Sequence, residues 1–197
     1  MIRRIQVLAL AALLAAPGVA AAQRPTTVIL VRHGEKATGN PLDQDPSLTP
    51  QGEQRARDLV AALRGTRVDA IITTQLKRTR QTARPLADSL HITPEETHMG
   101  HDTDAAAARV AALIRTRHMG QTVVVVGHTT TVPKIIGLLG GPSLGPICES
   151  AYGNLFTLVI PRQGQVRFTH GHYGAADPPG GHDCVNGLKE EHHHAHR

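Results

Sequence analysis

The sequence predicts a three-layer α/β/α sandwich in which helices cover both faces of a mostly parallel sheet, with an antiparallel hairpin at one edge. Apolar, β-branched runs at 26–31, 68–73 and 122–126 alternate with segments of helical spacing. Strands that are almost entirely apolar are typical of parallel sheets buried on both faces. Near the end of the chain, runs at 155–160 and 166–169 flank a turn containing proline and glycine, which predicts a hairpin.

The helices are predicted from capping residues and apolar spacing. Thr49-Pro50 is typical of a helix start, and Gly65 ends the segment that follows. Residues 76–90 have helical composition, although Pro85 is expected to kink this helix or to mark a boundary. The other helices are expected at 105–117 and 132–139, and a short strand is expected at His91-Ile92.

Residues 1–22 are interpreted as a secretory signal peptide. A basic head precedes an apolar run at 5–16, which is shorter than the roughly 20 residues that span a bilayer core. Small residues at 20–22 suit cleavage, so the mature chain is expected to begin near Gln23 and to be exported to the periplasm or the extracellular space. A single domain at 23–170 and a tail at 171–197, rich in His, Gly and Pro and with little regular structure, are expected to follow.

The charge balance favours a small anionic substrate. The chain carries 21 basic and 16 acidic residues, a formal +5, and loss of Arg3 and Arg4 with the signal leaves +3. Two Phe, two Tyr and no Trp argue against nucleic-acid binding, which uses basic stripes interleaved with aromatic residues. We expect no membrane span in the mature chain.

The two cysteines, Cys148 and Cys184, are an even pair in a chain that is expected to be exported. Such a pair favours a disulfide, and two independent thiols are the alternative.

Two histidines follow predicted buried strands directly. His33 comes after the first strand and His128 after the strand at 122–126, each beside a glycine. Arg32 adjoins His33, and Arg78 lies just beyond the second strand. Because reactive groups gather at the carboxyl ends of parallel strands, the four side chains are expected to surround one point. Imidazole and guanidinium groups in this arrangement form a pocket for a tetrahedral dianion.

At these residues the sequence resembles the histidine phosphatase superfamily, also called phosphoglycerate mutase-like proteins. The resemblance covers about 26–160 and depends on four motifs in order, which are Arg32-His33-Gly34-Glu35, Leu48-Thr49-Pro50-Gln51-Gly52, Arg78-Thr79-Arg80-Gln81-Thr82-Ala83 and Val126-Gly127-His128.

The resemblance implies a phosphatase that works in two steps without a cofactor or an essential metal. His33 would attack phosphorus to form a phosphohistidine, which water would then hydrolyse. Arg32, Arg78 and His128 would bind the phosphoryl oxygens and stabilise the charge of the transition state. The short loops between motifs favour a phosphatase over a mutase, and export disfavours a protein phosphohistidine phosphatase.

The general acid that protonates the leaving oxygen is not fixed by the motifs. His128 is followed by three threonines, so no acid stands directly after it. Asp102 is the preferred candidate and Glu96 the next, with Glu95 and Asp104 also available, and Asp102 can also be interpreted as a helix cap and nothing more. Glu35 is expected to orient neighbouring groups.

The histidine-rich end offers a second hypothesis. His192, His193, His194 and His196 suit zinc, copper or nickel, or belong to a disordered tail with opportunistic metal affinity. A non-catalytic protein that binds anions or metals on the same fold is therefore the alternative function.

Overall fold

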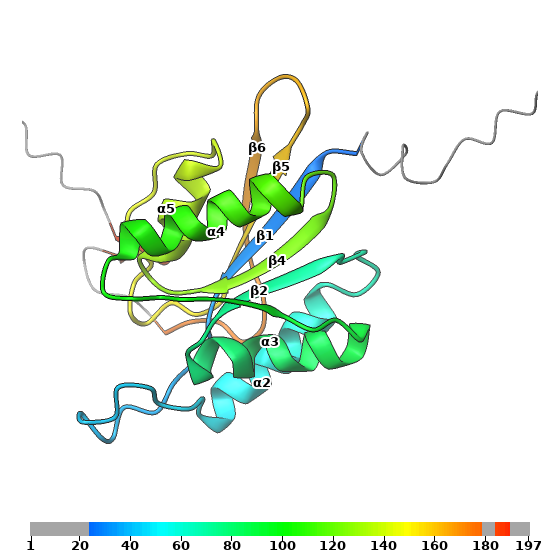
Figure 1. Cartoon of the computed structure of the whole chain (residues 1–197). Coiled ribbons are helices and arrows are strands. Elements are labelled where there is room, and N and C mark those ends of the chain that lie inside the picture. Colours follow the sequence, from blue (N-terminus) through cyan, green and yellow to red (C-terminus); the bar gives the residue numbers. More distant parts are fainter. Residues whose placement is uncertain (1–23, 179–183, 190–197) are drawn as a thin grey trace, which may run out of the picture.

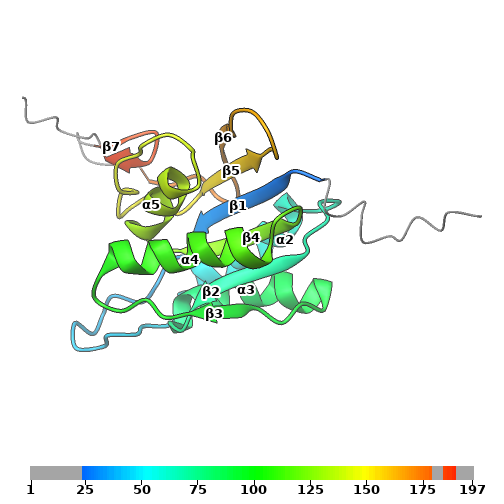
Figure 2. The ribbon, with the colours of Figure 1, turned by 45° about the horizontal axis from the view of Figure 1, so that its top comes forward.

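The computed structural model describes residues 24–178 and 184–189. Six strands form one sheet in the order β3-β2-β4-β1-β5-β6, and β1, β2, β3 and β4 pair in parallel, whereas β5 and β6 are antiparallel (Figures 1 and 2). Their bounds are β1 Thr26–Arg32, β2 Ala70–Thr74, β3 Glu95–Thr97, β4 Thr122–Gly127, β5 Asn154–Ile160 and β6 Arg167–His172. The predicted fold class and the predicted hairpin at the end of the sheet are confirmed.

Helices cover both faces of this sheet, as Figures 1 and 2 show from two directions. Helices α2 (Pro50–Ala62) and α3 (Lys77–Leu90) pack on one face, and α4 (Thr103–Arg117) and α5 (Thr131–Leu138) on the other. Side chains of β1 alternate between the two cores, because successive residues of a strand point to opposite faces. Val28 and Leu30 pack with α4 and α5, whereas Ile29 and Val31 pack with α2 and α3.

Helix α3 differs from its expected form at Pro85, because it runs without a break from Lys77 to Leu90. Ala83, Leu86 and Ala87 are buried against the sheet on both sides of this proline. Packing of that apolar face supplies most of the stability of a helix in a folded protein, so the helix survives the loss of one backbone hydrogen bond.

The strand expected at His91-Ile92 is absent, and the prediction was wrong. His91 ends α3 in the left-handed conformation, with φ of 53°, which is incompatible with an extended strand. The strand that pairs with β2 begins three residues after Ile92, at Glu95.

The expectation of little regular structure after residue 170 also needs correction. Strand β6 continues to His172, Tyr173 is buried, and a small hairpin is formed by β7 (Cys184–Val185) and β8 (Leu188–Lys189). The predicted Cys148–Cys184 disulfide is present, with sulfur atoms 2.04 Å apart. Composition does not predict this regular structure, because the structure depends on a disulfide and on contacts with residues distant in the sequence.

The predicted signal peptide and the histidines at 192–196 lie outside the described residues. Within the described ranges, every helix is too short or too polar to cross a membrane.

Candidate functional site

The two candidate histidines meet at the carboxyl ends of neighbouring parallel strands. Arg32, the last residue of β1, is in register with Gly127 of β4, and the His33 N–H donates to the Gly127 carbonyl at 3.0 Å. His33 and His128 therefore leave the sheet side by side, with ring centroids 5.4 Å apart. Both side chains are almost completely buried.

The His33 ring is held in one tautomer. Its Nδ1 lies 2.8 Å from the Gly34 carbonyl oxygen, which can only accept, so Nδ1 carries the proton and Nε2 keeps its lone pair. Burial lowers the pKa of His33 well below its ordinary value. The hydrogen bond to Gly34 opposes this shift, and electrostatic interactions with His128, Arg32 and Arg78 lower the pKa further. A neutral ring with a free Nε2 lone pair is the form that acts as a nucleophile.

His128 is positioned by a chain of hydroxyl groups. Its Nε2 lies 3.1 Å from the Thr74 hydroxyl, which is 2.9 Å from the hydroxyl of Thr79. Burial lowers the pKa of His128 to about 3, and Arg78 and then Arg32 contribute to the shift. The ring is therefore neutral near pH 7, and a bound anion would raise its pKa, because an opposite charge nearby favours the protonated form.

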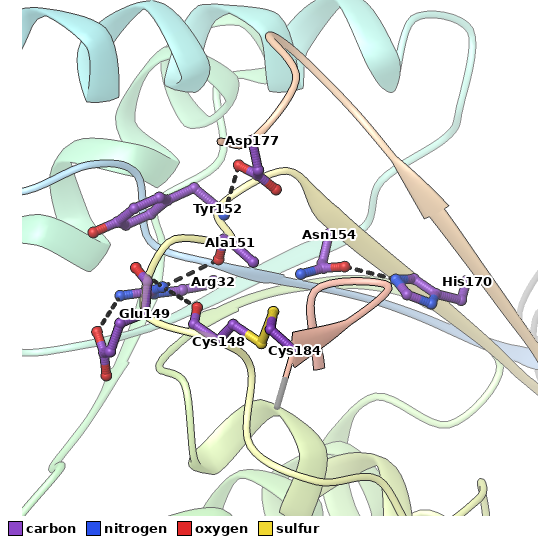
Figure 3. Close-up of a disulfide and its surroundings, with 9 residues drawn as sticks. All are labelled: Arg32, Cys148, Glu149, Ala151, Tyr152, Asn154, His170, Asp177 and Cys184. Atoms are coloured by element: carbon purple, nitrogen blue, oxygen red, sulfur yellow. Dashed lines mark hydrogen bonds and ion pairs between the residues drawn. A yellow bond between two sulfur atoms is a disulfide. The ribbon is translucent and has the colours of Figure 1, made fainter. Parts of the chain in front are cut away.

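Arg32 is 1% exposed and is held by the loop that precedes β5. Its Nη1 donates to the carbonyls of Cys148, Glu149 and Ala151 at 2.9, 2.9 and 3.1 Å, and its Nη2 donates to the Glu149 carboxylate at 2.9 Å (Figure 3). The guanidinium carbon lies 4.0 Å from the centre of the Tyr152 ring. The Nε atom is buried and has no hydrogen-bond partner in the part of the chain that the structure describes.

Arg78 lies in the first turn of α3 and is held more loosely. Its Nη1 is 3.7 Å from the carboxylate of Asp45, which also accepts a hydrogen bond from the Lys77 N–H at 2.9 Å. Burial lowers the pKa of Arg78, the charge of Asp45 opposes that shift, and the like charge of Arg32 adds to it. Two guanidinium groups that repel each other beside two neutral imidazoles form a site that favours a dianion.

Glycine allows the first two motifs to pack closely. A Cβ atom on Gly34 would lie 2.8 Å from the Gly52 carbonyl oxygen, and one on Gly52 would lie 2.2 Å from the Glu35 carbonyl oxygen. Helix α2 starts at this contact, where the Thr49 hydroxyl accepts from the Gly52 N–H at 3.2 Å. The second motif therefore supports the backbone on which His33 is carried.

The candidate acids proposed from sequence have contacts outside this cluster. Asp102, which is fully exposed, caps α4 by accepting the N–H groups of Asp104 and Ala105, and these bonds lower its pKa. Glu96 lies 3.6 Å from Arg80. Of the other carboxylates, Glu95 pairs with Arg117 and His118, Asp104 pairs with Lys134, and Glu35 is bound by buried Arg55.

Sequence reasoning missed three residues that contact the site arginines. Glu149 and Tyr152 contact Arg32, and Asp45 pairs with Arg78. All three stand in irregular segments outside the four motifs, where spacing carries no signal. Adjacency of Glu149 to a cysteine of the predicted disulfide was the one available hint.

The histidine-rich tail cannot be placed, because its residues are not among those described. Within the described ranges there is no group of three or more His, Cys, Asp or Glu side chains arranged to hold a metal ion.

Comparison with known proteins finds a family match over part of the chain. Residues 28–100 match the family described as the histidine phosphatase superfamily (branch 1). No curated protein matches the chain.

Solved structures share the fold at low sequence identity. A protein histidine phosphatase SixA complexed with tungstate has a TM-score of 0.58 at 19% identity, covering 74% of this chain and 96% of that one. A mycobacterial glucosyl-3-phosphoglycerate phosphatase has 0.56 at 17%, covering 74% and 97%. A putative phosphohistidine phosphatase SixA from Agrobacterium tumefaciens has 0.54 at 24%, covering 76% and 98%.

Proposed function

We propose that this chain, whose residues 28–100 match the histidine phosphatase superfamily (branch 1), is a phosphatase that hydrolyses a small phosphorylated substrate through a phosphohistidine on His33. The observation that carries the proposal is the state of the His33 ring. Its Nδ1–H is bound to the Gly34 carbonyl and its ring is neutral, so Nε2 is the available nucleophile. Arg32, Arg78 and His128 surround it with donors for the phosphoryl oxygens.

In the first step the Nε2 lone pair of His33 attacks phosphorus. The N–P bond forms while the bond to the leaving group breaks, and the leaving group departs with that electron pair and takes up a proton. The phosphorylated ring is cationic because Nδ1 keeps its proton, which the Gly34 carbonyl accepts in a hydrogen bond. In the second step water attacks phosphorus, the N–P bond breaks, and phosphate leaves as neutral His33 returns.

The test is hydrolysis of p-nitrophenyl phosphate by the purified chain in EDTA. We expect activity that survives chelation and falls by at least about 10³-fold in His33→Ala, because the substitution removes the nucleophile. His172→Ala, which changes an exposed histidine on β6, is the matched control and should keep wild-type activity. Acid-labile incorporation of labelled phosphate, lost in His33→Ala, would identify the intermediate.

Two results would contradict the proposed phosphatase activity. An inactive wild type that takes up zinc, copper or nickel through residues 192–196 would favour the non-catalytic metal-binding alternative. An inactive wild type that binds inorganic phosphate would favour an anion-binding role on the same fold.

The leaving oxygen of an alkyl phosphate needs a proton from a general acid. Asp102 stays our predicted acid, with Glu96 next, but the bonds by which Asp102 caps α4 lower its pKa and so disfavour the protonated form that a general acid needs. This favours substrates that need little protonation on departure, such as an aryl phosphate or a phosphorylated imidazole. The latter is the substrate class in the name of the SixA neighbours, but the export proposed below disfavours a protein phosphohistidine, so the aryl phosphate is the preferred class.

Comparison of p-nitrophenyl phosphate with glycerol phosphate separates these cases. If Asp102 donates the proton, Asp102→Asn should slow the alkyl substrate by at least about 10-fold and spare the aryl one, because only the alkoxide needs an acid. Asparagine also caps helices, so α4 is preserved. Equal rates in the variant and the wild type would exclude Asp102, and Glu96→Gln is the parallel test.

Export through a signal peptide at 1–22 is a further proposal. The disulfide supports it, since such bonds persist in oxidising compartments. The N-terminal residue of the protein secreted by a bacterial host tests it, and a start near Gln23 is expected.

A further inference from the structure

Arg32 presents two different edges. A guanidinium group carries its donors in a rigid plane, with Nη1 at one corner and with Nε and Nη2 along the opposite edge. The three carbonyls of Cys148, Glu149 and Ala151 converge on Nη1, as Figure 3 shows. The edge formed by Nε and Nη2 is thereby directed away from these carbonyls. Along this edge Nε has no hydrogen-bond partner among the described residues, and Nη2 donates to the exposed carboxylate of Glu149 at 2.9 Å. A phosphate offers the same charge and geometry as that carboxylate, so it can bind this edge in its place.

The carbonyls belong to a segment without regular structure that is held from two sides. On one side, the Ile147 N–H donates to the Thr129 carbonyl at 2.9 Å, next to His128. On the other, the Cys148 N–H donates to Gly187 at 2.9 Å and the Lys189 N–H donates to Pro146 at 2.8 Å. The segment therefore lies between the site and the hairpin β7–β8.

The hairpin needs an anchor to hold that position. Each of its strands has two residues, and an isolated hairpin is marginally stable at best in water. The Cys148–Cys184 disulfide joins the first residue of β7 to the single cysteine of the carbonyl-bearing segment, with Cα atoms 6.0 Å apart. One residue, Cys148, thus carries both the bridge and one of the carbonyls that hold Nη1.

We propose that Cys148 and Cys184 are positioning residues for catalysis, because their disulfide clamps hairpin β7–β8 onto residues 146–151 and so aims Arg32 at the phosphate. The proposal rests on the proposed phosphatase function. It assigns the bridge a role in anion affinity that reaches the substrate only through Arg32. Arg78, which is held by Asp45 from a different loop, should be independent of the bridge.

A double-mutant cycle tests this coupling. The dissociation constant of inorganic phosphate is measured by calorimetry in three backgrounds of the full chain, which are the wild type, Arg32→Lys and Arg78→Lys. In each background it is measured with the disulfide intact and with both cysteines replaced, as Cys148→Ser/Cys184→Ser. Loss of the bridge should raise the constant about 10-fold in the wild-type and Arg78→Lys backgrounds, and less than about 2-fold in Arg32→Lys, since only contacting groups couple strongly. An equal rise in all three backgrounds would mean a general structural effect and would overturn the proposal.

Reduction of the intact protein is the second arm, for the case in which the serine variant does not fold. Dithiothreitol gives two electrons and two protons to the bridge, which becomes two thiols while the reagent closes to a cyclic disulfide. Phosphate affinity should fall on reduction and return on reoxidation, and unchanged affinity would overturn the proposal. Hydrolysis of p-nitrophenyl phosphate by the oxidised wild type reports on the proposed function separately, and a wild type that neither hydrolyses nor binds phosphate sinks both proposals.

Discussion

The two arginines of the site are held in opposite ways. Arg32 is 1% exposed and donates from Nη1 to three backbone carbonyls, whereas Arg78 is 15% exposed and has a 3.7 Å ion pair with Asp45. Arg32 is fixed on Nη1 by backbone carbonyls, with the exposed Glu149 carboxylate on Nη2 at 2.9 Å, whereas Arg78 has only the carboxylate of Asp45, on the loop at 37–48, as a charge partner among the described residues.

This difference shows how rigidity is distributed around the phosphate. Backbone carbonyls cannot rotate away and are themselves held by neighbouring elements, so the direction of Arg32 is set before any ligand binds. The carboxylate that holds Arg78 can be displaced by an anion, because a phosphate offers the same charge and geometry. Arg32 therefore defines the position of the phosphoryl group, and Arg78 adjusts to it.

The largest expected effect is the loss of activity when Arg32, the rigidly held arginine, is replaced. Lysine at position 32 has three donors, and the three carbonyls can occupy all of them, which leaves none for phosphate. Arg32→Lys should lower kcat/KM for p-nitrophenyl phosphate by about 10²–10³-fold, in the range for loss of a preorganised donor. Arg78→Lys should cost about 10-fold, because a mobile ammonium can still reach the anion. Equal losses in the two variants would contradict the distinction.

A smaller effect concerns the charges of the same two arginines. After burial, Arg78 contributes more than Arg32 to the low pKa of His128, which is about 3. Arg78→Gln should therefore raise the pKa of His128 more than Arg32→Gln does, as measured by NMR titration of the ring protons. An equal rise would mean that the two charges act on His128 alike.

The same pKa predicts how stability depends on pH. The unfolded chain binds a proton at His128 near pH 6.5, whereas the folded chain does so near pH 3. The folded state is thus fully favoured above pH 6.5 and loses about 1.4 kcal/mol per pH unit from this group as pH falls through that window. Urea unfolding of wild type and His128→Gln at pH 7 and pH 5 measures the difference, and the variant should show the shallower dependence.

How much of the site could be predicted from sequence differs between the two arginines and their partners. Both arginines are predictable, because each stands in a motif at or just beyond the end of a parallel strand, and the order of β1, β4 and β2 brings those ends together. Their partners are not, because carbonyls carry no sequence identity and Asp45 lies in an irregular loop. Strand ends follow from hydrophobic patterning, but contacts between loops distant in sequence depend on tertiary structure that patterning does not encode.

The partners of the acids were hidden for the same reason. Asp102 was interpretable as a cap or as a proton donor from its place before a helix, and the structure shows the capping bonds. Order after residue 170 depends on Arg55, whose Nη1 donates to the carbonyls of Tyr173 and Ala175 at 3.1 Å. A buried arginine in the middle of α2 gives no sequence signal of such distant partners.

The smallest expected effect is a change in KM when Asp45, the carboxylate that holds Arg78, is replaced. Asp45→Asn removes the charge that competes with phosphate for Arg78, so KM for p-nitrophenyl phosphate should fall about 2–3-fold while kcat is unchanged. Asp43→Asn is the matched control, since Asp43 is an exposed carboxylate of the same loop that accepts the Asp45 N–H at 3.0 Å, a bond that asparagine can also accept. If both variants lower KM equally, the cause is the general field of the loop, and that shared effect should disappear at high salt. A fall confined to Asp45→Asn means that Arg78 exchanges its carboxylate for the substrate, as the looser side of the site requires.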